Sequence, residues 1–204
     1  MTSKNTDWKR RAEAVFAPLR EIDRSWLPRS LQDKERLLDV AMLRQSTRKL
    51  IYKCLSGDGR AIATADVSVP LWAQKGAAAQ RRTVMRLGAL ACSAPIKRTI
   101  EQMNLGALRR AIGEASYREA LDLDDAMIRN SLEKSYWQAM RDGDIQCFIG
   151  AMGLSVLHSA TPQDDAFIRQ NLRFLFSTRA WSLRRTDLTC DSDKICELLS
   201  DGND

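Results

Sequence analysis

The fold is decided by the stretch RTVMRLGALACSAPIKRTIEQM, residues 82–103. Its first half carries apolar and small residues at the i, i+3, i+4, i+7 spacing of a helix with one buried face: Val84, Leu87, Gly88 and Ala91. Ser93 is the expected N-cap of a second helix, with Pro95 in its first turn. The two helices must turn sharply and pack on each other, so we expect an all-helical fold built around this pair.

A second strongly patterned helix is expected to open at Asp144. Its apolar face comprises Ile145, Phe148, Ile149, Met152, Val156 and Leu157. Gly150 and Gly153 lie inside it, although glycine costs a helix interior about 1 kcal/mol relative to alanine. We therefore predict that a neighbouring helix approaches closely there, most simply the helix at residues 84–91.

Helical patterns also fill most of the remaining chain. The expected N-caps are Asn104, Asp124 or Asp125, and Thr161, and the expected breaks are Gly113 and Gly143. After Thr161 and Pro162, a helix should carry Phe167, Ile168, Leu172, Leu175 and Phe176. The prediction is an all-α, irregular multi-helix orthogonal bundle with a short extended loop near residues 60–70.

We expect residues 1–204 to form one helical domain with a candidate subdomain boundary near residues 56–70. The divisions would be N-terminal helices at 1–56, a main helical core at 70–190 and an acidic tail at 191–204, with one short amphipathic helix in the tail.

Composition excludes several classes of protein. Hydrophobic residues make up 44% of the chain, enough for a sizeable core, and the formal charge of +6 is modest for a dedicated nucleic-acid binder. Five cysteines are an odd number, and Cys92 and Cys147 lie in apolar helical stripes, which favours a reducing compartment such as the cytosol. No signal-peptide pattern and no run of about 18 apolar residues occurs, so we expect neither secretion by a cleaved signal nor a membrane span.

No sequence motif indicates a catalytic activity. His158 is the only histidine, which excludes multi-histidine metal sites, and we expect it to have a structural role at a helix end. Nucleophile-elbow, CxxC and phosphate-loop motifs are missing from the sequence. The carboxylates at Asp122, Asp124 and Asp125, and at Asp164 and Asp165, are explained by favourable interaction with helix N-termini. We expect no catalytic residue, no cofactor and no metal.

Basic clusters and tryptophans are the remaining surface signals. The basic clusters are Lys9-Arg10-Arg11, Arg81-Arg82, Arg109-Arg110 and Arg184-Arg185. Acidic residues are interspersed among them, which favours solvated faces with helix-pair partners over a nucleic-acid surface. The tryptophans, a residue type enriched at protein interfaces, are Trp8, Trp26, Trp72, Trp137 and Trp181. The default interpretation is a helical cytosolic adaptor, and the alternative is a helical nucleic-acid-binding or regulatory protein that uses the arginine doublets.

Two long segments carry a family resemblance: RLGALACSAPIKRTIEQMNLGALRRAIGEASYREAL, residues 86–121, and IQCFIGAMGLSVLHSATPQDDAFIRQNLRFLF, residues 145–176. They resemble the central and C-terminal blocks of the cytosolic accessory protein of bacterial type III secretion systems, the family of YscK, PscK and OrgA. The segment SWLP, residues 25–28, resembles the short tryptophan- or leucine-proline segment before the second helix of that family.

The resemblance implies a non-enzymatic protein of the sorting platform, at the cytoplasmic face of the inner membrane. Family members link the forkhead-associated-like cytoplasmic domain of the inner-membrane ring protein to the pod protein, which recruits the stator and the ATPase. We nominate the face with Trp8 and Arg11 and the corner with Trp26, Leu27 and Pro28 as protein-binding residues, because both lie outside the strongest core stripes.

Overall fold

The computed structural model of the chain divides it into two compact units. The first comprises residues 1–80 and 164–178, and the second comprises residues 81–163 and 179–204. The structure describes residues 22–27, 70–99, 105–123, 132–162, 168–169 and 171–201. The predicted boundary and extended loop near residues 56–70 lie almost entirely outside these ranges, and both stay predictions.

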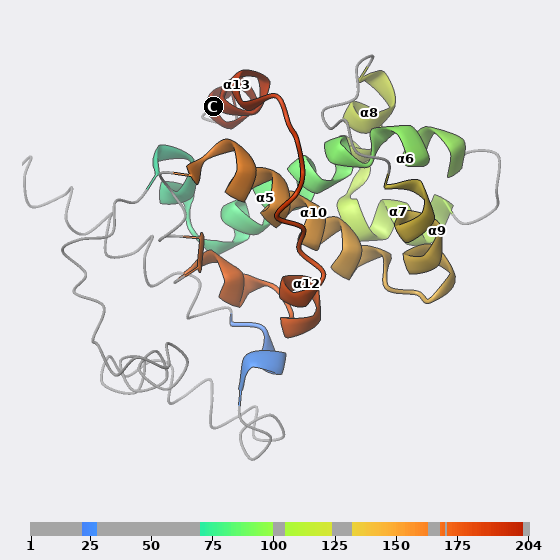
Figure 1. The fold of residues 1–204 in the computed structure, drawn as a ribbon, viewed down its shortest axis with the longest axis horizontal. Coiled ribbons are helices and arrows are strands. Elements are labelled where there is room, and N and C mark those ends of the chain that lie inside the picture. Colours follow the sequence, from blue (N-terminus) through green and yellow to red (C-terminus); the bar gives the residue numbers. More distant parts are fainter. Residues whose placement is uncertain are drawn as a thin grey trace, which may run out of the picture. The chain divides into compact units, whose positions relative to one another are not determined.

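The prediction of an all-α protein is confirmed. Every element in the described ranges is a helix, either α-helical or 3₁₀ (η). They are η1 (Arg24–Trp26), η2 (Leu71–Lys75), α5 (Ala77–Ala91), α6 (Ser93–Thr99), α7 (Leu105–Ile112), α8 (Glu114–Asp122), α9 (Glu133–Arg141), α10 (Ile145–Ala160), η4 (Leu172–Leu175), α12 (Thr178–Ser182) and α13 (Ser192–Asp201) (Figure 1).

The second unit is built on α10, of whose 16 residues 12 are buried. A helix that is apolar on all sides needs neighbours on all sides, and α7, α9 and α13 all pack against it. Helix α5 crosses it at the centre of the unit (Figure 1).

Two glycines make the crossing of α5 and α10 possible. A Cβ atom on Gly153 would stand 1.9 Å from the carbonyl oxygen of Val84, and one on Gly88 would stand 2.0 Å from the carbonyl oxygen of Ile149. The two backbones therefore touch directly, in the geometry that favours Cα–H···O contacts. The close approach predicted at Gly153 is confirmed. Gly150 is buried in the same helix, and its close approach stays a prediction.

The turn between α5 and α6 corrects one expected cap. The N–H of Ile96 bonds the carbonyl of Cys92, so Cys92 precedes the helix and Ser93 is its first residue. Pro95 is then the third residue, where a missing N–H breaks no bond because the first turn of a helix has no internal acceptors for its N–H groups. The predicted cap was one residue too late.

Turns and polar contacts join helices α6 to α9. The sequence predicted the turns at Gly113 and Gly143 but not the polar contacts. Gly113 and Gly143 adopt positive φ values of 81° and 73°, in the turns before α8 and α10, as expected of helix breaks. Between α6 and α9, the Tyr136 hydroxyl lies 2.9 Å from Thr99 Oγ1, which itself donates to the Pro95 carbonyl. The tyrosine must therefore donate to the threonine. Asn104, Asp124 and Asp125 lie outside the described residues.

The end of α10 and the segment after it differ from expectation. Thr161 is the C-cap residue of α10, and its hydroxyl donates to the Leu157 carbonyl at 2.8 Å. The start predicted after it falls mostly outside the described residues. Further on, Leu172 and Leu175 are buried as expected, but they belong to the 3₁₀ turn η4 rather than to a continuous α-helix. A spacing of three residues fits both kinds of helix.

Candidate protein-binding site

The corner around Trp26 is anchored within the first unit. The indole N–H of Trp26 donates to the Phe176 carbonyl at 2.6 Å, and its ring meets Phe174 edge-on with centroids 5.3 Å apart. The Arg173 guanidinium lies 5.3 Å from the centre of the Trp26 ring and 4.6 Å from that of Phe174. These are cation–π distances. Trp26 is thus held by a segment 150 residues away in the chain.

A set of hydrogen bonds around Ser25 also holds this corner together. The Asp23 carboxylate accepts hydrogen bonds from the backbone N–H of Ser25 at 3.0 Å and from its hydroxyl at 2.7 Å. The same hydroxyl accepts from the N–H of Thr178 at 2.8 Å, and the N–H of Asp23 donates to the Phe174 carbonyl at 2.7 Å. Thr178 is the first residue of α12, so Ser25 satisfies one of the N–H groups that a helix start leaves without an internal acceptor.

The five nominated binding residues have different positions. Leu27 is only 5% exposed and therefore packs inward, while Trp26 is partly exposed beside the exposed Arg24 and Ser25. Trp8, Arg11 and Pro28 lie outside the described residues. The surface offered by the corner is the exposed part of Trp26 together with its polar neighbours, whereas Leu27 is buried. Their role in partner binding stays a prediction.

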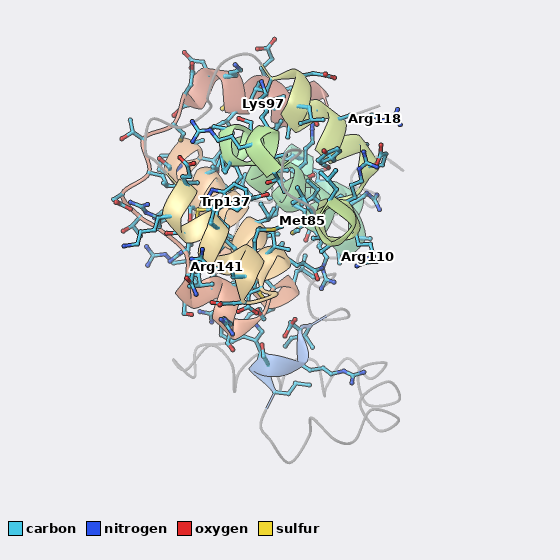
Figure 2. All side chains as sticks on the ribbon, turned by 90° about the vertical axis from the view of Figure 1, so that its right-hand side faces the viewer. Met85, Lys97, Arg110, Arg118, Trp137 and Arg141 are labelled. Atoms are coloured by element: carbon cyan, nitrogen blue, oxygen red, sulfur yellow. The ribbon has the colours of Figure 1, made fainter. Side chains whose placement is uncertain are left out.

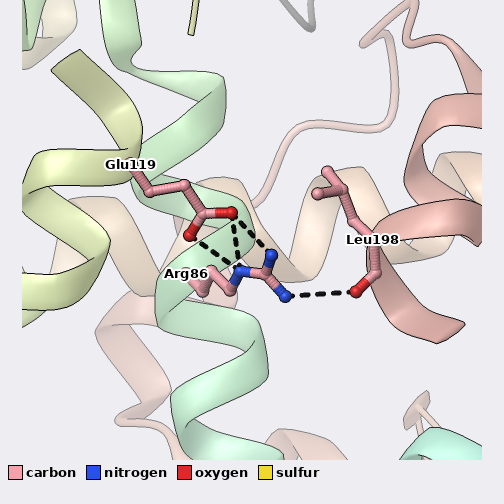
Figure 3. Close-up of polar contacts among 3 residues, drawn as sticks. All are labelled: Arg86, Glu119 and Leu198. Atoms are coloured by element: carbon pink, nitrogen blue, oxygen red, sulfur yellow. Dashed lines mark hydrogen bonds and ion pairs between the residues drawn. The ribbon is translucent and has the colours of Figure 1, made fainter. Parts of the chain in front are cut away.

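Arg86 joins three helices of the second unit. Its Nε lies 2.9 and 2.8 Å from the two carboxylate oxygens of Glu119 on α8, and its Nη2 is 2.6 Å from Oε1. Its Nη1 donates to the Leu198 carbonyl on α13 at 3.1 Å (Figure 3). The pair is about one-third exposed, with side-chain accessibilities of 28% and 33%. Helical periodicity gives no sign of these contacts, because it does not identify partners that are distant in the sequence.

The outer face of α6 to α9 carries mixed charge. Arg110, Arg118 and Arg141 lie on this side of the unit in Figure 2. Glu114 accepts from Arg118 at 3.0 Å and lies 3.6 Å from Arg109, whose guanidinium also stacks 4.8 Å from the Tyr117 ring centre. Arg98 pairs with Glu133 and lowers the pKa of that carboxyl by its hydrogen bond.

The last arginine doublet is also engaged within the chain. The guanidinium of Arg184 lies 3.7 Å from the Trp181 ring centre. Arg185 pairs with Asp187 at 2.6 Å, and this hydrogen bond lowers the pKa of the aspartate. Arg109, Arg184 and Arg185 thus have partners of their own, as expected for solvated faces rather than for a surface kept open to phosphates.

The titratable groups do not converge on a reaction centre in the described part of the chain. Within it, no three His, Cys, Asp or Glu side chains are grouped as metal ligands. Burial raises the pKa of the Cys92 thiol, which is unsuited to act as a thiolate. His158 lies in the last turn of α10 as expected. Asp122 contradicts expectation, because it is the last residue of α8 and not at a helix start. Of the described helices, none is both long and apolar enough to cross a membrane.

A comparison with known families gives a match over most of the chain. The model of the family described as "YOP proteins translocation protein K (YscK)" matches residues 13–186. No curated protein and no solved structure matches the chain. The matched range includes the Trp26 corner and the crossing of α5 and α10, and it ends before α13.

Proposed function

The chain belongs to the YscK family of type III secretion proteins, and from this premise we propose that it is a non-enzymatic adaptor of the secretion injectisome. It links the forkhead-associated-like cytoplasmic domain of the inner-membrane ring protein to the pod protein, and through the pod protein to the stator and the ATPase. Its place is the cytoplasmic face of the bacterial inner membrane.

The observation that carries this proposal is the family match across 174 of the 204 residues, from 13 to 186. Two features of the molecule support it. The Trp26 corner presents a partly exposed tryptophan held in place by Phe174, Phe176 and Arg173, and rigid aromatic anchors of this kind dominate binding energies at protein interfaces. Arg109, Arg184 and Arg185 meanwhile make contacts within the chain, which disfavours the nucleic-acid alternative.

The test is capture of the cytoplasmic domain of the ring protein by the purified chain at roughly physiological salt, about 150–200 mM. We expect capture to survive this salt, because burial of an aromatic anchor depends little on ionic strength. Binding to RNA or DNA would instead weaken by orders of magnitude between about 50 and 200 mM salt.

Variants locate the surface. Trp8→Ala and Trp26→Ala should each weaken capture more than Arg109→Ala combined with Arg110→Ala. Because Trp26 also anchors its own corner, Arg24→Glu on the exposed side of η1 is the companion variant, and circular dichroism checks that each variant remains folded. Absence of capture, together with tight salt-sensitive binding to nucleic acid, would overturn the adaptor in favour of its alternative.

A further inference from the structure

The 3₁₀ turn η1 is held by few hydrogen bonds of its own. It has three residues, and the backbone N–H groups of Trp26 and Leu27 donate to the carbonyls of Asp23 and Arg24. The hydrogen bonds of 3₁₀ turns have poor geometry, and fixing the backbone of each residue costs conformational entropy. The orientation of Trp26 must therefore depend on contacts outside η1.

The segment of residues 173–178 supplies contacts of this kind to both Trp26 and Ser25. The hydrogen bond between the N–H of Thr178 and Ser25 Oγ has a fixed direction, because a backbone N–H can only donate. The single proton of the Ser25 hydroxyl then goes to the Asp23 carboxylate, at 2.7 Å. The hydroxyl is thus held from both sides, and it belongs to the residue immediately before the tryptophan.

The N–H of Thr178 is not needed for the helix that it begins. Thr178 is the first residue of α12, and the N–H of a first helical residue has no acceptor within its own helix. Proline is well tolerated at this position, because its missing N–H breaks no helical hydrogen bond. The contact with Ser25 can therefore be removed while α12 keeps its internal hydrogen bonds.

We propose that Ser25 and the N–H of Thr178 are positioning groups of the binding corner, which hold Trp26 in the orientation that the partner recognises. A backbone group 153 residues from Ser25 thereby belongs to the working site. Neither group has to touch the partner, because apparent affinity falls with the fraction of molecules whose site has the binding arrangement. The inference rests on the proposed function, in which Trp26 contacts the partner.

A matched pair of variants isolates the hydrogen bond. Thr178→Pro and Thr178→Ala both lose the threonine side chain, but only the proline variant lacks the N–H. We expect Thr178→Pro to bind the cytoplasmic domain of the ring protein about threefold to tenfold more weakly than Thr178→Ala, as the loss of one hydrogen bond implies. Ser25→Ala should also weaken capture, and Ser25→Thr should restore most of it because threonine keeps the hydroxyl.

A double-mutant cycle separates positioning from direct contact with the partner. If the N–H of Thr178 acts through Trp26, the difference between Thr178→Pro and Thr178→Ala should vanish in the Trp26→Ala background. A group that contacted the partner itself would add its loss to that of Trp26. Additive losses would overturn the proposal, and so would equal capture by the two Thr178 variants.

Fluorine NMR of the chain labelled with fluorotryptophan observes Trp26 without any partner. The chain has five tryptophans, and Trp26→Phe identifies the signal of residue 26. Relative to Thr178→Ala, Thr178→Pro should shift or broaden this signal and leave those of Trp72 and Trp137, in η2 and α9, in place. An unchanged Trp26 signal would overturn the positioning role. A changed signal with no capture by the unmodified chain would overturn the adaptor role alone.

Discussion

The crossing of α5 and α10 and the corner around Trp26 hold together in opposite ways. At the crossing, Gly88 and Gly153 let two backbones touch inside an apolar core. At the corner, one tryptophan and a serine hydroxyl reach a segment about 150 residues away through hydrogen bonds to its backbone. The first contact depends on side chains being absent, and the second depends on particular side chains being present.

This difference decides how each region responds to change. A close backbone contact tolerates no added atom, whereas a side-chain anchor can be trimmed in steps. Substitutions at Gly153, Trp26, Tyr136 and Gly106 test that contrast, from the largest expected effect to the smallest.

Gly153→Ala should destabilise the second unit strongly, and Gly153→Leu more so. Even the alanine Cβ would stand 1.9 Å from the Val84 carbonyl oxygen, and a backbone atom cannot rotate aside. We expect losses of about 3 kcal/mol or more for leucine, at the upper end of overpacking effects. Urea denaturation measures this. Unchanged midpoints would mean that the two helices can separate without cost, and the contrast with the corner would then collapse.

Trp26→Ala should cost the first unit about 2–3 kcal/mol, because it removes a partly buried ring and leaves the Phe176 carbonyl without its donor. Trp26→Phe keeps a ring beside Phe174 and loses only the indole N–H, so about 1 kcal/mol is expected. Thermal melts of the two variants test this graded response. Equal losses would show that the hydrogen bond alone anchors the corner.

Tyr136→Phe should cost about 1 kcal/mol at neutral pH, because the hydrogen bond to Thr99 is lost. Burial raises the pKa of Tyr136 to about 12 from an ordinary 10.0. The neutral hydroxyl therefore contributes stability that is complete below pH 10 and is lost as pH rises towards 12, since the unfolded chain ionises first. Urea midpoints of both proteins between pH 9 and 12 (a window set by this titration) should converge as pH rises. A constant difference would mean that the hydroxyl ionises equally in both states.

Gly106→Ala should change the stability least of these substitutions. A Cβ there meets nothing within 4 Å, so the substitution adds helix propensity without a clash. We expect a gain of about 0.5 kcal/mol, because the site is in the first turn of α7. The same atom added at Gly106 and at Gly153 should change urea midpoints in opposite directions. A loss at Gly106 would indicate that α7 packs more tightly than its exposed surface suggests.

Much of the second unit was predictable because the spacing of apolar residues along each helix shows which of its faces is buried. The apolar stripes of α5 and α10 and the two interior glycines indicated a buried close pair, and the acidic tail indicated the amphipathic α13. Errors arose where one pattern fits two structures. A proline is tolerated at several positions of the first turn of a helix, so Pro95 did not fix the N-cap, and Ser93 was predicted to be the cap although it is the first helical residue. A spacing of three residues fits both an α-helix and a 3₁₀ helix, so Leu172 and Leu175 were assigned to the wrong kind of helix.

The candidate binding site was less predictable. Trp26 could be singled out as a tryptophan outside the core stripes, but its contacts with Phe174, Phe176 and Arg173 join positions that no local pattern connects. Arg86 likewise gave no sign of Glu119 or of the α13 carbonyl. Periodicity identifies the face that is buried, but it did not identify the partners of Trp26 and Arg86.

The reciprocity of the glycine contact has a mechanical consequence. Val84 and Gly88 on one helix, and Ile149 and Gly153 on the other, are each four residues apart and exchange roles across the crossing. Sliding either helix by one residue would bring a Leu87 or Met152 side chain against a carbonyl oxygen that now faces only a hydrogen. The close contact at the crossing therefore prevents α5 and α10 from sliding along each other. A change of shape in the second unit would have to leave this crossing intact.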